Sequence, residues 1–215
     1  MNDNGEGIDR IQAGLERAAR NGIKPATIVD IGAGVGGWSQ IAMGVWPGLQ
    51  ALCFEPAPWH RPQLEDFQRR TGGQPIYAMA GDKRGHGLFW LSTPDAPWVS
   101  HGVSEPQPGA VELDCSTIDD EVRDRGLPGP YLLKLDTHGF EARVLDGARE
   151  SLKQTCLIVV ESYFVPQGPD SLAFWDLCKR LERDGFRPTD FTEFYRQPGD
   201  GRLFSIDFIF EREHG

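Results

Sequence analysis

Asp136 and His138 are the residues whose types and spacing most directly indicate chemistry. They follow the apolar run that begins at residue 131, and one residue separates them. An alcohol is a poor nucleophile at neutral pH and needs a general base or a metal ion. Imidazole titrates near neutral pH, so we expect His138 to take a proton from a hydroxyl group. Asp136 would orient the imidazole or face a cofactor's amino group. The plain alternative is a loop histidine that faces solvent.

A third candidate, Glu161, ends the apolar run CLIVVE at residues 156–161. The carboxyl ends of parallel strands meet at one edge of a sheet, so Asp136 and Glu161 are expected to converge. Together with His138 they would offer ligands to Mg²⁺ or another divalent ion. Whether a metal is bound stays open at this point.

Residues 29–39, VDIGAGVGGWS, read as a glycine-rich loop after a short strand. Its glycines fit G-x-G-x-x-G, the pattern of dinucleotide-binding loops. Glu55 ends the next strand, 18 residues beyond Gly37, where an acid accepts hydrogen bonds from ribose hydroxyls. NAD and S-adenosylmethionine both carry an adenosine ribose, so this spacing fits either one. A tight turn that only packs a helix against a strand is the structural alternative.

Three features favour S-adenosylmethionine over NAD. Asp30 precedes the glycines; its carboxylate would repel a pyrophosphate and attract the ammonium group of an aminoacyl tail. The segments FRPTDF and LFSIDFIFE, joined by residues 197–201, predict a terminal β-hairpin. Such a reversed last strand is typical of Rossmann-like methyltransferases. A dehydrogenase usually needs a further catalytic domain, for which 215 residues leave no room.

The expected cofactor contacts lie on the glycine loop and at the ends of the strands around it. They are Asp30, Gly32, Ala33, Gly34, Gly36, Glu55, Pro56, Ala80, Gly81, Asp82 and Asp136. We expect the glycine loop to line the methionine half of the cofactor and Glu55 to bind the ribose. Residues 80–82, after the third strand, should flank the adenine.

Alternating strands and helices must position these residues. Apolar runs predict buried strands at 26–31, 49–55, 75–81, 131–136 and 156–161, with further strands at 87–92 and 111–115. Helical spacing predicts helices at 7–21, 37–45, 58–70, 140–152 and 171–184, and one that Ser116 or Thr117 caps. The pattern predicts an α/β fold: a Rossmann-like methyltransferase sandwich with a mostly parallel seven-stranded sheet, helices on both faces and a C-terminal antiparallel β-hairpin. We expect a single domain over residues 1–215, with an N-terminal helix within residues 1–22.

Residues 94–109 form a loop that is longer than most connections and contains four prolines. We expect this loop to cover the acceptor site, with Trp98 and His101 stacking on a sugar ring or closing the site. A surface loop without that role is the alternative.

Composition excludes several classes of partner. The formal net charge is −10 and the longest basic cluster is Arg69-Arg70, which argues against a nucleic-acid substrate because phosphates demand a positive face. No run of 18 apolar residues predicts a membrane span, and the N-terminus lacks the plan of a signal peptide. The four cysteines form no C-x-x-C pair and are expected to be reduced thiols in a cytoplasmic protein.

The stretch from residue 131 to residue 152 resembles the FkbM family of S-adenosylmethionine-dependent methyltransferases. The family pattern is roughly K-[IL]-D-x-x-G-x-E-x-x-[VL]-x-x-G-A, and it is filled by Lys134, Leu135, Asp136, Gly139, Glu141, Val144, Gly147 and Ala148. VDIGAGVG, FEPAP, LDCSTIDD and VVES resemble other family segments, so the resemblance spans residues 26 to about 165. The chain departs from the family at His138, where an acid or an amide is common, and at Gly34, where asparagine is frequent.

This resemblance implies O-methylation of a hydroxyl group on a small natural product, a sugar or a glycoconjugate. An NAD-dependent oxidoreductase is the alternative within enzymes. A non-catalytic cofactor-binding partner in glycan or polyketide assembly is the alternative outside them. A homodimer is compatible with the sequence, and neither the acceptor nor the oligomeric state follows from it.

Overall fold

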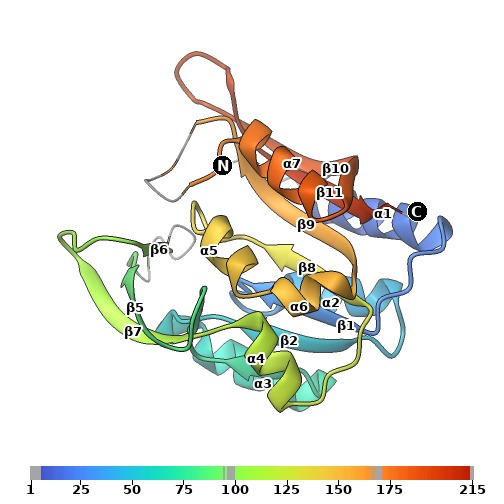
Figure 1. Ribbon diagram of the computed structural model, residues 1–215, viewed down its shortest axis with the longest axis horizontal. Coiled ribbons are helices and arrows are strands. Elements are labelled where there is room, and N and C mark those ends of the chain that lie inside the picture. The colour runs from blue at the N-terminus through green and yellow to red at the C-terminus, as the bar shows by residue number, and fades with distance from the viewer. Residues whose placement is uncertain (1–5, 94, 96–99, 166, 168–170, 214–215) are drawn as a thin grey trace.

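The computed structural model describes residues 6–93, 95, 100–165, 167 and 171–213. Within these residues the chain forms a seven-stranded sheet in the order β10-β11-β9-β8-β1-β2-β3 and a four-stranded sheet in the order β4-β7-β5-β6 (Figure 1). The strands of the large sheet are β1 Thr27–Ile31, β2 Gln50–Phe54, β3 Gln74–Ile76, β8 Tyr131–Leu135, β9 Thr155–Tyr163, β10 Phe186–Arg196 and β11 Leu203–Arg212. Those of the small sheet are β4 Met79–Ala80, β5 Gly85–Trp90, β6 His101–Val103 and β7 Ala110–Ser116.

All strands of the large sheet run in the same direction except β11, which comes last along the chain. β1 pairs in parallel with β2 and β8, and β8 pairs in parallel with β9. β11 runs antiparallel to both β9 and β10. The short connection between β10 and β11 leaves no room for a crossover helix, so the chain must return as a hairpin. The predicted parallel sheet with a C-terminal antiparallel hairpin is confirmed.

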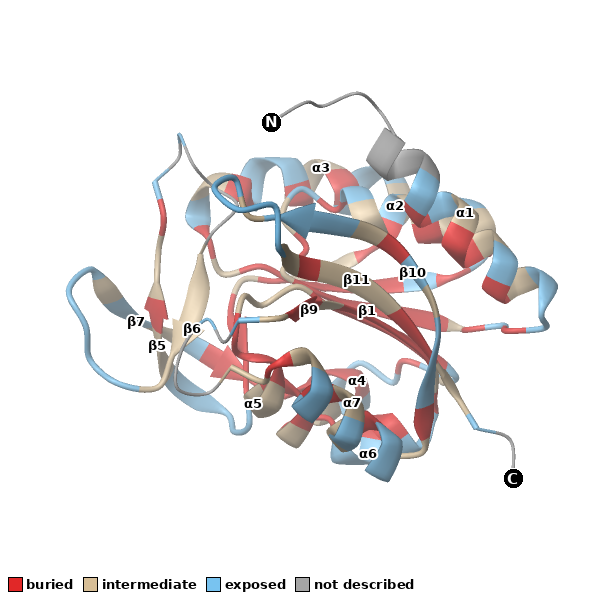
Figure 2. Ribbon diagram, turned by 90° about the horizontal axis from the view of Figure 1, so that it is seen from above, coloured by how far each residue is buried: buried red, intermediate tan, exposed pale blue. Residues whose placement is uncertain are grey.

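Helices cover both faces of the large sheet, as Figure 2 shows. One face carries α1 Glu6–Arg20, α2 Gly37–Val45 and α3 Arg61–Thr71. The other carries α4 Ile118–Asp124, α5 Glu141–Asp146, α6 Arg149–Lys153 and α7 Phe174–Arg183. A short 3₁₀ turn, η1 Pro58–His60, precedes α3. None of the described helices is both long and apolar enough to cross a membrane.

The central strands are apolar on both faces because each face packs against a helical layer. Every residue of β1 is buried. Ile28 joins the core under α1, α2 and α3, whereas its neighbour Val29 joins the core under the other helices. Alternation of side chains across a strand therefore feeds two separate cores, and the continuous apolar runs of the sequence are the consequence.

The segment predicted as one strand at 75–81 is instead divided between the two sheets. β3 pairs with β2 in the large sheet, whereas β4 pairs with β7 in the small sheet. β5, β6 and β7 complete the small sheet, which lies beside the carboxyl ends of the large sheet's strands (Figure 1). Period-two patterns identify strands but not their partners, so the second sheet was not predicted. The expected loop at 94–109 contains β6, and Trp98 lies outside the described residues.

The helix predicted over 140–152 is interrupted at Gly147. α5 ends at Asp146 and α6 begins at Arg149. A Cβ at Gly147 would lie 2.0 Å from the carbonyl oxygen of Gly81. The carbonyl of Gly147 accepts a hydrogen bond from the amide of Asp119 at 3.0 Å instead of continuing the helix. Tertiary contacts therefore override the helical pattern here.

Candidate active site

A cavity of about 260 Å³ lies under the glycine loop, at the carboxyl ends of β1, β2 and β8. The loop turns sharply because Gly32 and Gly36 have φ angles of 75° and 81°, which glycine adopts without strain. At Gly32 a Cβ would lie 2.2 Å from the carbonyl oxygen of Asp136. Only glycine therefore lets the loop meet the end of β8. We call this space the glycine-loop cavity.

Seven of the eleven predicted cofactor residues line this cavity: Gly32, Ala33, Gly34, Glu55, Pro56, Ala80 and Asp136. The other four, Asp30, Gly36, Gly81 and Asp82, are not among the lining residues. Asp82 instead accepts a hydrogen bond from Arg143 at 3.1 Å, and the amide of Gly81 donates to the carbonyl of Ser116. Direct contact of these four with a cofactor stays a prediction. The structure adds lining residues without a sequence signal, among them Phe89 and Phe140.

Asp30 lies beneath the glycine loop rather than on its surface. Its side chain has no exposed area. The hydroxyl of Ser39, in α2, donates to Oδ2 of Asp30 at 2.7 Å, and the ammonium nitrogen of Lys134 lies 3.3 Å from Oδ1. Asp30 thus ties β1 to α2 and neutralises a buried lysine.

Lys134 is a site residue whose role the sequence did not reveal. Its side chain is 8% exposed, and it donates to the carbonyl of Gly32 at 2.9 Å and to Oδ2 of Asp136 at 3.2 Å. Burial lowers its pKa, but the carboxylates of Asp136 and Asp30 outweigh burial and raise the pKa above its usual range. A lysine in the middle of the buried strand YLLKL was the available signal, since lysine is almost never buried unless it is paired.

Glu55 points into the glycine-loop cavity from the end of β2. Its carboxylate accepts the amide of Gly34 at 2.8 Å and the amide of Ala57 at 2.9 Å. Burial raises the pKa of Glu55, and these two backbone donors act against that rise. The contact with Gly34 fixes the acid against the glycine loop, where an adenosine ribose is expected.

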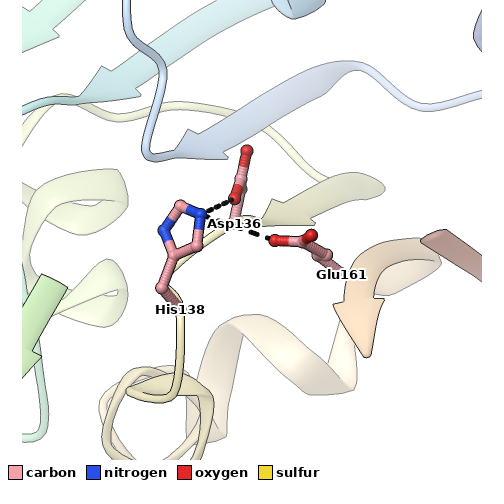
Figure 3. A group of neighbouring side chains, drawn as sticks. All are labelled: Asp136, His138 and Glu161. Carbon is pink, nitrogen blue, oxygen red and sulfur yellow. Dashed lines mark ion pairs between the residues drawn. The ribbon is translucent and has the colours of Figure 1, made fainter. Parts of the chain in front are cut away.

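Asp136, His138 and Glu161 converge at the carboxyl ends of β8 and β9 (Figure 3). The Nε2 atom of His138 lies 3.6 Å from Oδ1 of Asp136 and 3.6 Å from Oε2 of Glu161. The side chain of His138 is 27% exposed. The structure therefore brings together the three polar residues that the sequence placed at the ends of these strands.

The two carboxylates of this group differ in their affinity for protons. Burial raises the pKa of Asp136, but the charges of Lys134 and His138 outweigh burial and lower it overall. Glu161 has a raised pKa, first because it is buried and next because Asp136 is negative. Hydrogen bonds from Tyr163 and from Ser205, the latter at 3.0 Å, act against that rise. Asp136 is thus the fixed negative charge of the group, and Glu161 holds its proton more tightly.

His138 occupies an unusual backbone conformation. Its φ angle is 53°, in the left-handed region that costs a non-glycine residue about 1 kcal/mol or more. Its Nδ1 atom is buried and has no hydrogen-bond partner among the described residues. The Nε2 atom is the one that faces the carboxylates. A strained residue with an unsatisfied nitrogen is a feature of functional sites.

A second cavity of about 730 Å³ adjoins the first. Trp38, Lys134, Asp136 and His138 line both cavities. The second one is also lined by acidic residues of β9, β10 and β11 and by several aromatic rings, so we call it the carboxylate cavity. His101, on the segment expected to cover the acceptor site, lines it and stacks on Trp90 with ring centroids 5.4 Å apart.

The three converging side chains also have the composition of a metal site. One donor atom from each of Asp136, His138 and Glu161 lies within 4.8 Å of the other two. Carboxylate oxygens suit Mg²⁺ and Mn²⁺, and imidazole suits transition metals. The same geometry suits an imidazole base flanked by two acids.

The strand order and the reversed terminal strand define the Rossmann-like methyltransferase fold. The structure of magnesium protoporphyrin IX methyltransferase ChlM from Synechocystis PCC 6803, with bound SAM, is similar with a TM-score of 0.52 at 12% identity; the match covers 96% of this chain and 78% of that one. The 1,6-didemethyltoxoflavin-N1-methyltransferase of Burkholderia thailandensis, with bound S-adenosylhomocysteine, matches with a TM-score of 0.50 at 12% identity, over 98% of this chain and 80% of that one. Identities this low establish the fold alone.

The profile of the methyltransferase FkbM domain matches residues 30–188. The chain therefore belongs to the FkbM family of methyltransferases. It is also similar to the 2-O-methyltransferase NoeI of Sinorhizobium fredii, with 25% identity over 150 residues. That alignment spans 62% of this chain and 62% of NoeI.

Proposed function

We propose that this protein is an S-adenosylmethionine-dependent methyltransferase that methylates a hydroxyl group on a small natural product, a sugar or a glycoconjugate. The observation that carries the proposal is the meeting of the two cavities at Asp136 and His138. One cavity has a glycine loop and a ribose-binding acid, and the other has room for an acceptor. Membership of the FkbM family and the similarity to a 2-O-methyltransferase support this proposal.

The glycine-loop cavity fits the proposed cofactor. Gly32 and Gly34 leave the backbone open to close approach, and Glu55 offers carboxylate oxygens to the ribose hydroxyls. Asp136 supplies a negative charge to the cofactor's ammonium group, because its pKa is lowered. Ala80 and Phe89, which both line the cavity, provide apolar surface for the adenine.

His138 is the proposed general base. When bound, the cofactor supplies a sulfonium methyl group whose transfer to an acceptor oxygen requires loss of the hydroxyl proton. Nε2 of His138 takes that proton, and the carboxylates of Asp136 and Glu161, both 3.6 Å away, stabilise the imidazolium that forms. The base is held at the boundary of the two cavities, where acceptor and methyl group must meet.

A base accounts for this group better than a metal ion does. The ammonium of Lys134 lies 3.2 Å from Oδ2 of Asp136, and its charge disfavours a second cation on the same carboxylate. A metal-bound histidine almost always donates its other ring N–H to an acceptor. The Nδ1 atom of His138 has no such partner among the described residues.

The first experiment is isothermal titration of the purified protein with S-adenosylhomocysteine and, separately, with NAD⁺, each with and without Mg²⁺. We expect micromolar binding of S-adenosylhomocysteine alone, without a requirement for the metal. Binding of NAD⁺ instead would favour the oxidoreductase alternative and overturn the proposal. Turnover is then followed as release of S-adenosylhomocysteine with hydroxylated acceptors. Cofactor binding without turnover on any of them would support a non-catalytic partner.

A further inference from the structure

The carboxylate cavity is rich in acidic side chains. Four acids line it from four neighbouring strands: Asp136 after β8, Glu161 in β9, Glu193 in β10 and Asp207 in β11. The ammonium of Lys134 also lines the cavity, but it is already paired with Asp30 and Asp136. The acids of β10 and β11 have no matching cation among the described lining residues.

Among the described residues, Asp207 has fewer hydrogen-bond and ion-pair partners than the other three acids. It lies directly opposite Glu161 in the antiparallel pairing of β11 with β9, and like charges in that position are destabilising. Nothing in the described part of the chain donates a hydrogen bond to its carboxylate or forms an ion pair with it. Its pKa is raised well above the usual range, first by burial and then by Asp136, Glu161 and Glu193.

Glu193, on the neighbouring strand β10, acts on Asp207 through its charge and raises the pKa of Asp207. The hydroxyl of Tyr195 donates to Oε2 of Glu193 at 3.1 Å, which fixes the side chain. Both Glu193 and Tyr195 line the cavity. A fixed carboxylate beside an unpaired one makes a local negative site on the wall formed by β10 and β11.

The rest of the lining favours an organic cation over a metal ion. Tyr163, Phe204 and Trp90 contribute aromatic surface to the cavity, and aromatic faces attract ammonium groups. A hard divalent ion requires several oxygen ligands at about 2.0–2.6 Å, and the close donor group of the site includes neither Glu193 nor Asp207. The cavity volume of about 730 Å³ suits an organic molecule.

We propose that the acceptor is an amine-bearing polyol, such as an amino sugar or amino alcohol, whose protonated amine binds Glu193 and Asp207. This inference rests on the proposed function. The ammonium group would occupy the wall of β10 and β11, and a hydroxyl of the same molecule would then face His138. The carboxylates thus select the acceptor by its charge and orient the hydroxyl that is methylated.

The test compares three probes that differ in a single substituent: methyl glucosaminide, its N-acetyl derivative and methyl glucoside. Binding is measured by calorimetry or ligand-observed NMR at roughly pH 7, where the amine is largely protonated. We expect the glucosaminide to bind at least about tenfold more tightly than either neutral probe, because hydrogen bonds to charged groups are the stronger ones. Equal binding of the three probes, or no binding of the amine, would overturn the proposal.

Two variants locate the effect. Glu193→Gln and Asp207→Asn keep the shape of the side chains and remove their charge. Each variant should bind the glucosaminide about tenfold more weakly than the unaltered protein does and should bind S-adenosylhomocysteine equally well. Glu211→Gln, also in β11 but outside the cavity lining, is the matched control and should bind as the unaltered protein does.

Failure of this inference is distinguishable from failure of the proposed function. Amine preference is measured without cofactor and reports on the carboxylate cavity alone. Loss of S-adenosylhomocysteine binding by the unaltered protein would count against the methyltransferase proposal itself. If the unaltered protein binds Mg²⁺ or Mn²⁺ and both variants lose that binding, the acids hold a metal and the amine proposal is wrong.

Discussion

The ammonium nitrogen of Lys134 donates a 2.9 Å hydrogen bond to the main-chain carbonyl of Gly32. This contact joins the middle of the large sheet to the glycine loop. The same nitrogen lies 3.3 Å from Asp30 and 3.2 Å from Asp136. One buried cation therefore holds together the strand that enters the loop, the loop itself and the acid at the candidate active site.

Replacing Lys134 with methionine should destabilise the protein by about 3–5 kcal/mol, because the buried Asp30 would lose its counter-charge. Urea unfolding measures this loss. The double variant Lys134→Met/Asp30→Asn should recover part of it, since the uncompensated charge is removed as well. Lys153→Met is the control: its exposed ion pair with Glu150 should contribute less than about 1 kcal/mol. Equal effects of Lys134→Met and Lys153→Met would contradict the prediction.

Gly32→Ala and Gly22→Ala form a matched pair, because both glycines have positive φ angles of 75° and 94°. At Gly22 nothing lies within 4 Å of the added methyl group, so we expect only conformational strain of about 1–2 kcal/mol. At Gly32 the methyl group meets the carbonyl of Asp136, and displacement of the loop should bring the cost to about 3 kcal/mol or more. Urea unfolding measures both costs. Only Gly32→Ala should also abolish S-adenosylhomocysteine binding. If this variant still binds the compound, the cofactor does not require the glycine loop to keep its position.

His138→Asn tests the general base. Asparagine tolerates the left-handed conformation, so stability should change by less than about 0.5 kcal/mol. Turnover should fall about 10²-fold or more, because asparagine accepts no proton at neutral pH. Affinity for S-adenosylhomocysteine should stay unchanged. His86→Asn, at an exposed position of β5, is the control and should leave turnover unaltered. Unaltered turnover in His138→Asn would show that His138 is not the general base.

Glu55→Gln tests the ribose contact. The amide can accept hydrogen bonds but carries no charge, so affinity for S-adenosylhomocysteine should fall about tenfold or more. Calorimetry gives the affinity, and far-ultraviolet circular dichroism checks the fold. Glu65→Gln removes an exposed charge on α3 and should bind normally. Full affinity in Glu55→Gln would place the ribose elsewhere.

Asp207→Asn should stabilise the protein in a pH-dependent way. The pKa of Asp207 is raised above its ordinary value of 3.8 by burial and by the charges of Asp136, Glu161 and Glu193, against the opposing charge of Lys134. The contribution of Asp207 to folding stability is therefore fully present below pH 3.8 and is lost as the pH rises through the raised pKa. The variant should gain stability at about pH 8, with the gain shrinking as the pH approaches about 4.

Urea midpoints across this pH range measure the effect. Asp114→Asn, at an exposed position of β7, serves as the control and should show no such trend. A gain of the same size at both ends of the range would show that Asp207 does not titrate as described.

The sequence predicted the large sheet well because its signals are local. The apolar runs of β1, β8 and β9 are too short for helices, and helical stripes separate them. Residues 197–201 join the last two strands too closely for a crossover, so the hairpin followed directly. The glycine loop and the acids at strand ends then placed Glu55, Asp136, His138 and Glu161 at one edge of the sheet.

Other features arose from contacts between distant residues. Ala80 is next to β3 in the chain but pairs in the small sheet, because β7 offers it a partner. The helix pattern through Gly147 gave no warning of the close approach of Gly81. Free energy gained in such contacts overrides local propensity, and no window along the chain contains both partners.

The sequence by itself determined the class of fold, the family and the residue types at the strand ends. These follow from periodicity and from turns that only glycine or proline permits. The tertiary structure alone decided which charges meet: Lys134 beneath the glycine loop, His138 between two acids, and Asp207 opposite Glu161. Electrostatic energies depend on distance and burial in three dimensions, and those quantities exist only once the sheet has assembled.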